Sequence, residues 1–168
     1  MCIRDRMEFS RRAKNLYADR EAVVDGDLRF SYAEFLERCD RWSNALQKLG
    51  VKQGDRVAYI APNTHSHLEG YYAVPQIGAV LVPINYRLQS SDFEYILNHC
   101  GAKIICAHPD YMDAVDEIRG QLKSIESFVT LEGSREGWLE YETTLQAHDP
   151  DFQPVSIDES DLITINYT

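Results

Sequence analysis

No long apolar run is present in the sequence, and none of its segments approaches the ~20 consecutive apolar residues needed to cross a bilayer. An apolar segment typical of a secretory signal is also missing behind the first residues. We therefore expect a soluble chain with no membrane span. We take the cytoplasm as its default location.

Paired cysteines and metal-binding patterns are also missing. None of the four cysteines lies in a C-x-x-C motif, and they are Cys2, Cys39, Cys100 and Cys106. This spacing favours free thiols in a reducing compartment, with Cys100 and Cys106 as small core residues. The five histidines lack a thiol or carboxylate at ligand spacing, so the sequence predicts no metal site.

Positive charge is scarce, because 17 Lys and Arg face 27 Asp and Glu for a formal net charge of -10. The basic residues are scattered along the chain. A nucleic acid is therefore a poor candidate partner, since phosphate attraction would require a local basic patch. A small anionic ligand remains compatible with the charge, because one helix terminus and one or two cations suffice to bind it.

The composition is otherwise that of an ordinary globular chain. At 168 residues, with 44% hydrophobic and 26% charged residues, the chain has the size of one domain or of part of a larger one. Residues 1–6 precede a second methionine, Met7, and resemble a translated artefact. We leave residues 1–6 out of the fold prediction and take residues 7–168 as the unit.

Apolar segments too short for helices alternate with amphipathic segments along the whole chain. Two short strands are predicted in residues 22–31, around the Asp25-Gly26-Asp27 turn. Further strands are predicted at residues 56–61, 79–84, 103–107, 127–131 and 162–167. Predicted helices lie between them at residues 31–50, 64–78, 91–101, 110–122 and 138–147.

Helix boundaries carry their own signals. Ser31 with Glu34 and Ser91 with Glu94 match capping boxes, and Asp110 is a candidate cap. Proline and acidic residues predict a loop over residues 148–160. Strands this apolar must be buried on both faces, so we predict an α/β fold with a mostly parallel sheet flanked by helices.

Ligands of such sheets bind beyond the carboxyl ends of the strands, where we expect four turns. Residues 61–64 could hold an anion, but Asn63 or Thr64 as a plain helix cap is the simpler interpretation. Arg87, in the turn at residues 83–88, could contact a phosphate or be a solvated side chain. Residues 108–110 indicate a turn and a cap, and nothing follows the strand that ends at residues 167–168.

The residues alone give no further chemistry. They contain no nucleophile beside a base, no carboxylate pair of defined geometry and no Gly-rich loop. A central strand with nothing after it predicts an incomplete unit.

Several segments in order resemble the adenylate-forming superfamily of acyl-CoA synthetases, firefly-type luciferases and peptide-synthetase adenylation domains. They are residues 22–26, 31–34, 49–58, 62–64, 78–88, 95–103 and 161–168. The last segment is similar to the strand that feeds the family's T-S-G-T-T-G-x-P-K-G phosphate-binding loop. The resemblance thus implies a partial N-terminal domain of an adenylate-forming ligase, truncated where that loop begins.

This resemblance implies that the intact protein activates a small carboxylic acid, of medium chain length or similarly apolar, with ATP, and then transfers it to CoA. Mg²⁺ would accompany ATP. Thr168 would be the first residue of the phosphate loop, and Arg87 matches an arginine that contacts the nucleotide phosphate of CoA. Tyr86 stands where proline is common. The catalytic residues would lie beyond Thr168. Alternatives are a non-catalytic α/β module and an adenylation domain that loads a carrier protein.

Overall fold

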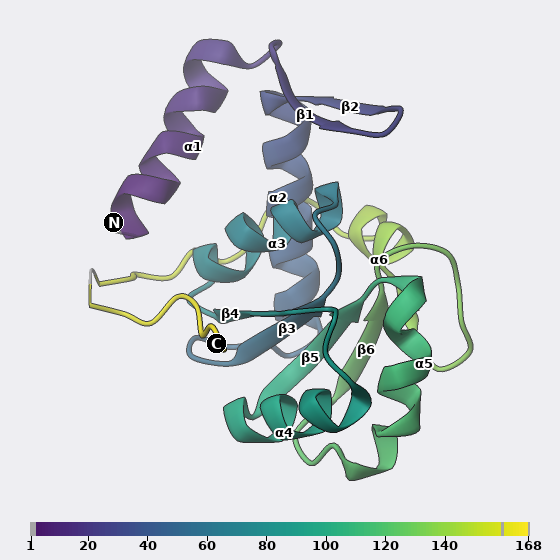
Figure 1. The fold of residues 1–168 in the computed structure, drawn as a ribbon. Coiled ribbons are helices and arrows are strands. Elements are labelled where there is room, and N and C mark those ends of the chain that lie inside the picture. The colour runs from purple at the N-terminus through teal and green to yellow at the C-terminus, as the bar shows by residue number, and fades with distance from the viewer. Residues whose placement is uncertain (1–2, 159, 168) are drawn as a thin grey trace.

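The computed structural model describes residues 3–158 and 160–167 (Figure 1). Its elements in chain order are α1 (Ile3–Tyr17), β1 (Glu21–Asp25), β2 (Leu28–Ser31), α2 (Tyr32–Lys48), β3 (Arg56–Ile60), α3 (His65–Gln76), β4 (Val80–Ile84), α4 (Ser90–Cys100), β5 (Ala102–Ala107), α5 (Pro109–Glu117), η1 (Arg119–Gln121), β6 (Ser127–Thr130), β7 (Leu139–Glu140) and α6 (Tyr141–Gln146). No helix among the described residues is long and apolar enough to span a membrane.

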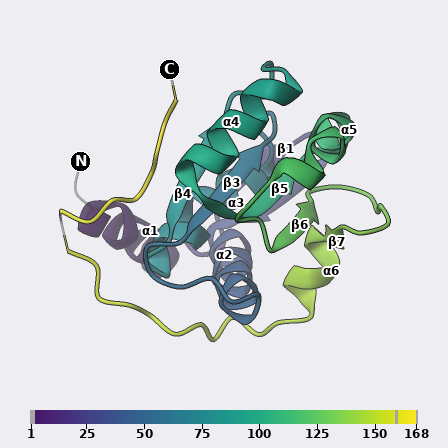
Figure 2. The same cartoon turned by 90° about the horizontal axis from the view of Figure 1, so that it is seen from below.

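Five strands form a parallel sheet in the order β4-β3-β5-β6-β7. Helices α2, α3 and α6 cover one face, and α4 and α5 cover the other (Figures 1 and 2). A separate antiparallel hairpin, β1-β2, precedes α2. The predicted α/β fold with a parallel sheet flanked by helices is therefore confirmed.

Alternation along the strands divides the core into two layers. Val57 and Tyr59 point toward α2 and α3, whereas Ala58 and Ile60 point toward α4 and α5. Tyr59 is fully buried, and its hydroxyl accepts a hydrogen bond of 2.8 Å from Trp42 Nε1. A Cβ atom on Gly70 would lie only 2.6 Å from Cζ of Tyr59, so glycine lets α3 approach the sheet closely.

Two of the predicted helix boundaries are confirmed by their backbone geometry. Ser31 and Glu34 form the expected capping box at the start of α2. Gly101 follows α4 in the left-handed conformation, with φ of 62°, as expected of a glycine that ends a helix.

Two predicted caps are wrong. Helix α4 begins at Ser90, so its third residue is Asp92, whose carboxylate accepts a hydrogen bond of 3.1 Å from the amide of Gln89. Ser91 and Glu94 therefore lie inside the helix. At α5 the cap is His108, whose Nδ1 accepts a hydrogen bond of 3.3 Å from the amide of Asp110.

Three predicted elements also differ in extent. The helix expected over residues 110–122 stops at Glu117 and continues as the short turn η1. The helix expected over residues 138–147 begins later, because Leu139 and Glu140 pair with β6 as strand β7. The strand expected at residues 162–167 is reduced to one parallel bridge between Thr164 and Leu81 at the free edge of β4.

Candidate functional site

The carboxyl edge of the sheet is the candidate site. All five strands are parallel, so the turns after β3, β4 and β5 emerge along one edge, where ligands of such sheets bind. Tyr167, at the end of the last predicted strand, places its hydroxyl 2.7 Å from Nδ1 of His99 on α4. Thr168 lies outside the described residues, and its place in a phosphate loop stays a prediction.

Arg87 projects from the turn after β4 and is exposed. Its backbone amide donates a hydrogen bond of 3.1 Å to Oδ1 of Asn85, and its guanidinium lies 5.5 Å from the ring centre of Tyr86. Within residues 3–158 and 160–167, no carboxylate is within ion-pair distance of this guanidinium. Arg87 is thus held at its backbone and available for an anion.

The turn after β3 is occupied by the protein's own groups. Thr64 caps α3, because its Oγ1 accepts a hydrogen bond from the amide of His67. The carboxylate of Asp25, from the hairpin, accepts a hydrogen bond of 2.8 Å from the amide of His65. This backbone hydrogen bond is the largest cause of a lowered pKa of Asp25, and the hydrogen bond to the His65 ring is the second. The interpretation of Thr64 as a cap is confirmed, and Asp25 supplies the anion at this helix terminus.

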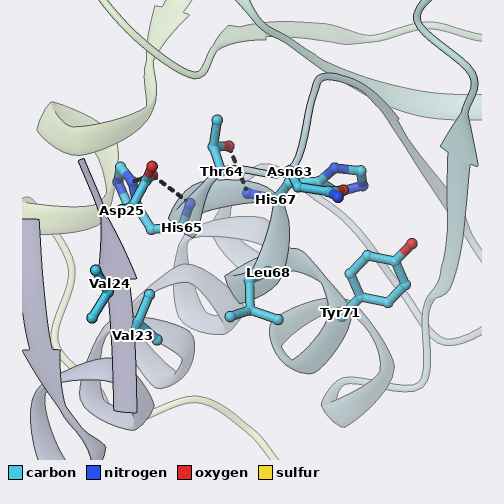
Figure 3. A pocket seen from close by; sticks show the side chains of 9 residues that line it. All are labelled: Val23, Val24, Asp25, Asn63, Thr64, His65, His67, Leu68 and Tyr71. Carbon is cyan, nitrogen blue, oxygen red and sulfur yellow. Dashed lines mark hydrogen bonds and ion pairs between the residues drawn. The ribbon is translucent and has the colours of Figure 1, made fainter. Parts of the chain in front are cut away.

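A cavity of about 210 Å³ lies between the hairpin and the start of α3 (Figure 3). Its lining is mainly apolar and includes Val23, Val24, Leu68 and Tyr71. His67 also lines it, stacked between Tyr59 and Tyr71 with both ring-centre distances at 5.3 Å. Burial lowers the pKa of His67, and His65, which also lines the cavity, is bound by Asp25 and Glu142. Neither imidazole therefore offers an unpaired cation to a phosphate. The cavity is also smaller than the 300–1,000 Å³ of ordinary ligand pockets.

Sequence reasoning missed a partly buried ionic cluster, which joins α2, α3, α6 and β1 (the Arg38 cluster: Arg38, Glu69, Tyr141, Glu142, His65 and Asp25). The guanidinium of Arg38 donates to both carboxylate oxygens of Glu69, at 2.5 and 3.3 Å. It also donates to Glu142, at 2.9 Å through Nη1. Glu69 is fully buried, and its second partner is the hydroxyl of Tyr141 at 2.5 Å.

His65 extends this cluster to the hairpin. Its Nδ1 lies 2.8 Å from Oδ2 of Asp25, and its Nε2 lies 3.5 Å from Oε1 of Glu142. Desolvation opposes a charge on His65, but hydrogen bonds to Glu142 and Asp25 outweigh it and raise the pKa of this imidazole. Desolvation likewise opposes the charge on Glu142, yet His65 and Arg38 together lower the pKa of Glu142 to about 2.

The two buried histidines should give opposite dependences of stability on pH. The raised pKa of His65 means that its contribution is full below about pH 6.5 and is lost as the pH rises through the folded-state pKa. We expect the difference in unfolding free energy between the unsubstituted protein and His65→Gln to be largest near about pH 5.5. Urea denaturation across the range up to about pH 8.5 should show this difference shrinking.

His67→Phe is the matched control, because it keeps a ring between Tyr59 and Tyr71 and removes a group with a lowered pKa. A lowered histidine pKa costs stability as the pH falls, so the same comparison for His67→Phe should change in the opposite direction. A pH-independent difference for His65→Gln would show that His65 is neutral in the cluster.

The described residues contain no group of three or more His, Cys, Asp or Glu that could hold a metal ion. No signal in the sequence pointed to the Arg38 cluster either. Arg38 and Glu69 are 31 residues apart in the sequence and lie on different helices. In the structure Leu68 is exposed and Glu69 is buried.

Comparison with known proteins identifies the chain's relatives. The AMP-binding enzyme family matches residues 9–168. A long-chain-fatty-acid–CoA ligase of Thermus thermophilus is 39% identical over 166 residues, covering 96% of this chain and 30% of that protein. A peroxisomal trans-cinnamate:CoA ligase of Petunia hybrida is 30% identical over 185 residues, covering 96% of this chain and 32% of that protein.

Solved structures agree on the fold. An anthranilate CoA ligase in complex with anthranoyl-AMP superposes with a TM-score of 0.92 at 24% identity, over 96% of this chain and 31% of that one. The chain thus spans about a third of the length of the relatives that it matches.

Proposed function

This chain belongs to the AMP-binding enzyme family, and we propose that it is the amino-terminal part of an acid–CoA ligase. The observation that carries the proposal is the match over residues 9–168, which takes in nearly every described element. The named relatives are CoA ligases for different acids.

The proposed reaction has two steps. A carboxylate oxygen attacks the α-phosphorus of ATP, and pyrophosphate leaves. The acyl carbon then carries AMP as its leaving group in place of the poor leaving group of a free carboxylate. The thiolate of CoA then attacks the acyl carbon, and AMP leaves with its bonding electrons. Mg²⁺ would neutralise phosphate charge when bound. The described residues provide no ligand set for it, so we assign it no contact with them.

Within this scheme the chain supplies the frame and one cation. Arg87 would contact the nucleotide phosphate of CoA, since it is exposed at the carboxyl edge and no described carboxylate neutralises it. Thr168 would open the loop that binds the phosphates of ATP. The remaining groups of the reaction would belong to later residues.

For the substrate we propose a small apolar carboxylic acid, with a medium-chain fatty acid as the first candidate. The similarity to a long-chain-fatty-acid–CoA ligase, at 39% identity, supports a fatty acid and does not decide its chain length. The similarity to a cinnamate ligase, at 30% identity, makes an aromatic acid the competing candidate.

Carboxylate-dependent exchange of pyrophosphate into ATP tests this proposal on the full-length gene product. We expect exchange with decanoate or cinnamate and none when the acid is left out. The preferred acid should have the higher kcat/KM. Absence of exchange across straight-chain and aromatic acids would disprove the proposed activity.

A further inference from the structure

Four side chains form a continuous row across the turns that follow β4 and β5. The guanidinium of Arg87 lies 5.5 Å from the ring of Tyr86, whose centre is 5.2 Å from that of Tyr111. The ring of His108 lies 6.1 Å beyond Tyr111. Residues from the turn after β4 and from the start of α5 thus meet at the carboxyl edge, where ligands of parallel sheets bind.

The two tyrosine rings are half-buried and pack at one side against the core beneath α4 and α5. Their inclination of 34° leaves them tilted rather than flat against each other. Each ring thus packs against the core and stays partly exposed. Rigid, partly exposed aromatic rings are the surfaces on which nucleic-acid bases stack.

Charge along the row is unequal. Arg87 provides a positive charge at one end, with no described carboxylate paired to it. At the other end, His108 lies 3.4 Å from the carboxylate of Asp110 and 3.7 Å from that of Glu132. A phosphate is favoured at the Arg87 end and disfavoured at the Asp110 end, so a ligand with one anionic and one aromatic part would bind in a single orientation.

We propose that Tyr86 and Tyr111 form a stacking surface for the adenine ring of CoA, with the phosphates of the same nucleotide beside Arg87. This inference rests on the proposed function for the identity of the nucleotide. It adds two binding residues and an orientation to the proposed contact of Arg87. Tyr86 is then a part of the site.

Direct titration of the 168-residue chain tests the stacking surface without relying on catalysis. The probe is adenosine 3′,5′-bisphosphate, which carries the base and the phosphates, and pyrophosphate is the comparison because it has no base. Tyr86→Leu and Tyr111→Leu should weaken binding of the bisphosphate by about 5- to 100-fold and leave that of pyrophosphate unchanged. Arg87→Ala should weaken both.

Two further variants separate stacking from folding. Tyr111→Phe keeps the ring and should bind the bisphosphate as the unsubstituted chain does. Tyr95→Leu removes an exposed ring on α4, away from the row, and should have no effect. Thermal unfolding of each variant identifies losses of binding that come from misfolding. If a leucine variant is misfolded, binding of the bisphosphate to Tyr111→Phe shows whether the ring, without its hydroxyl, is sufficient.

The stacking surface is disproved if the bisphosphate does not bind, or if the leucine variants bind it as tightly as the unsubstituted chain. Pyrophosphate exchange by the full-length protein is measured separately. Exchange without a tyrosine effect leaves the proposed function standing and rejects the stacking surface. A tyrosine effect without exchange supports the nucleotide site and rejects the ligase.

Discussion

Replacing Arg38 with methionine is expected to lower the free energy of unfolding by about 3–5 kcal/mol. The change would leave the fully buried carboxylate of Glu69 with the hydroxyl of Tyr141 as its remaining partner. An unpaired buried charge is costly, and burial already raises the pKa of Glu69 despite the guanidinium beside it. Urea denaturation at about pH 7 measures the effect, with an unchanged m-value as evidence of a comparable unfolded state.

Lys14→Met is the matched control, since the exposed Lys14 pairs with the half-buried Asp40 at 3.6 Å. Its removal should cost no more than about 1 kcal/mol. The double variant Arg38→Met with Glu69→Leu should recover much of the lost stability, because it removes both buried charges. If Arg38→Met costs no more than Lys14→Met, Glu69 is not a buried carboxylate that depends on Arg38.

The Arg38 cluster also explains how the hairpin is held. A two-stranded hairpin is only marginally stable by itself, and β1-β2 does not join the five-stranded sheet. Asp25, at the end of β1, binds His65 at the start of α3, and His65 in turn approaches Glu142 on α6. The cluster therefore anchors the hairpin to the carboxyl edge of the sheet. Residues of the hairpin and of the cluster also line the cavity (Figure 3).

Local patterns in the sequence were sufficient for most of the fold. The apolar run of β3 predicted a buried strand, and the structure places Val57 and Ala58 in opposite layers of the core. Ser31 and Gly101 set helix boundaries through contacts with residues that are close in the sequence, so both boundaries can be predicted from local motifs. Helix capping and strand length depend on residues that are neighbours in the sequence, so they can be predicted without knowledge of the tertiary structure.

The features that local sequence patterns did not predict depend on tertiary contacts. Leu139 and Glu140 form a strand only because Val129 and Thr130 lie beside them. The burial of Glu69 likewise depends on Arg38, which another helix supplies. The place of Arg87 after a strand and the family resemblance both indicate a phosphate contact. Its neighbours in the row come together only through the tertiary fold, which places the start of α5 beside the turn after β4.

Replacing Arg87 with alanine in the full-length gene product is expected to raise the KM for CoA by about 10- to 100-fold, the loss of one charge-assisted contact to phosphate. Exchange of pyrophosphate into ATP should be unchanged, because CoA takes no part in the first step of the proposed reaction. The exposed position of Arg87 and the absence of a carboxylate partner among the described residues favour a contact made only with the ligand. Initial rates of thioester formation over a range of CoA concentrations measure the effect.

Arg87→Lys separates charge from shape in this contact. Lysine keeps one positive charge but lacks the planar pair of donors, so its KM for CoA should fall between those of arginine and alanine. Raising the salt concentration should weaken CoA binding to the unsubstituted enzyme more than to Arg87→Ala, since an exposed ion pair is screened. Equal losses in exchange and in thioester formation would instead assign Arg87 a structural role in the turn that Asn85 begins.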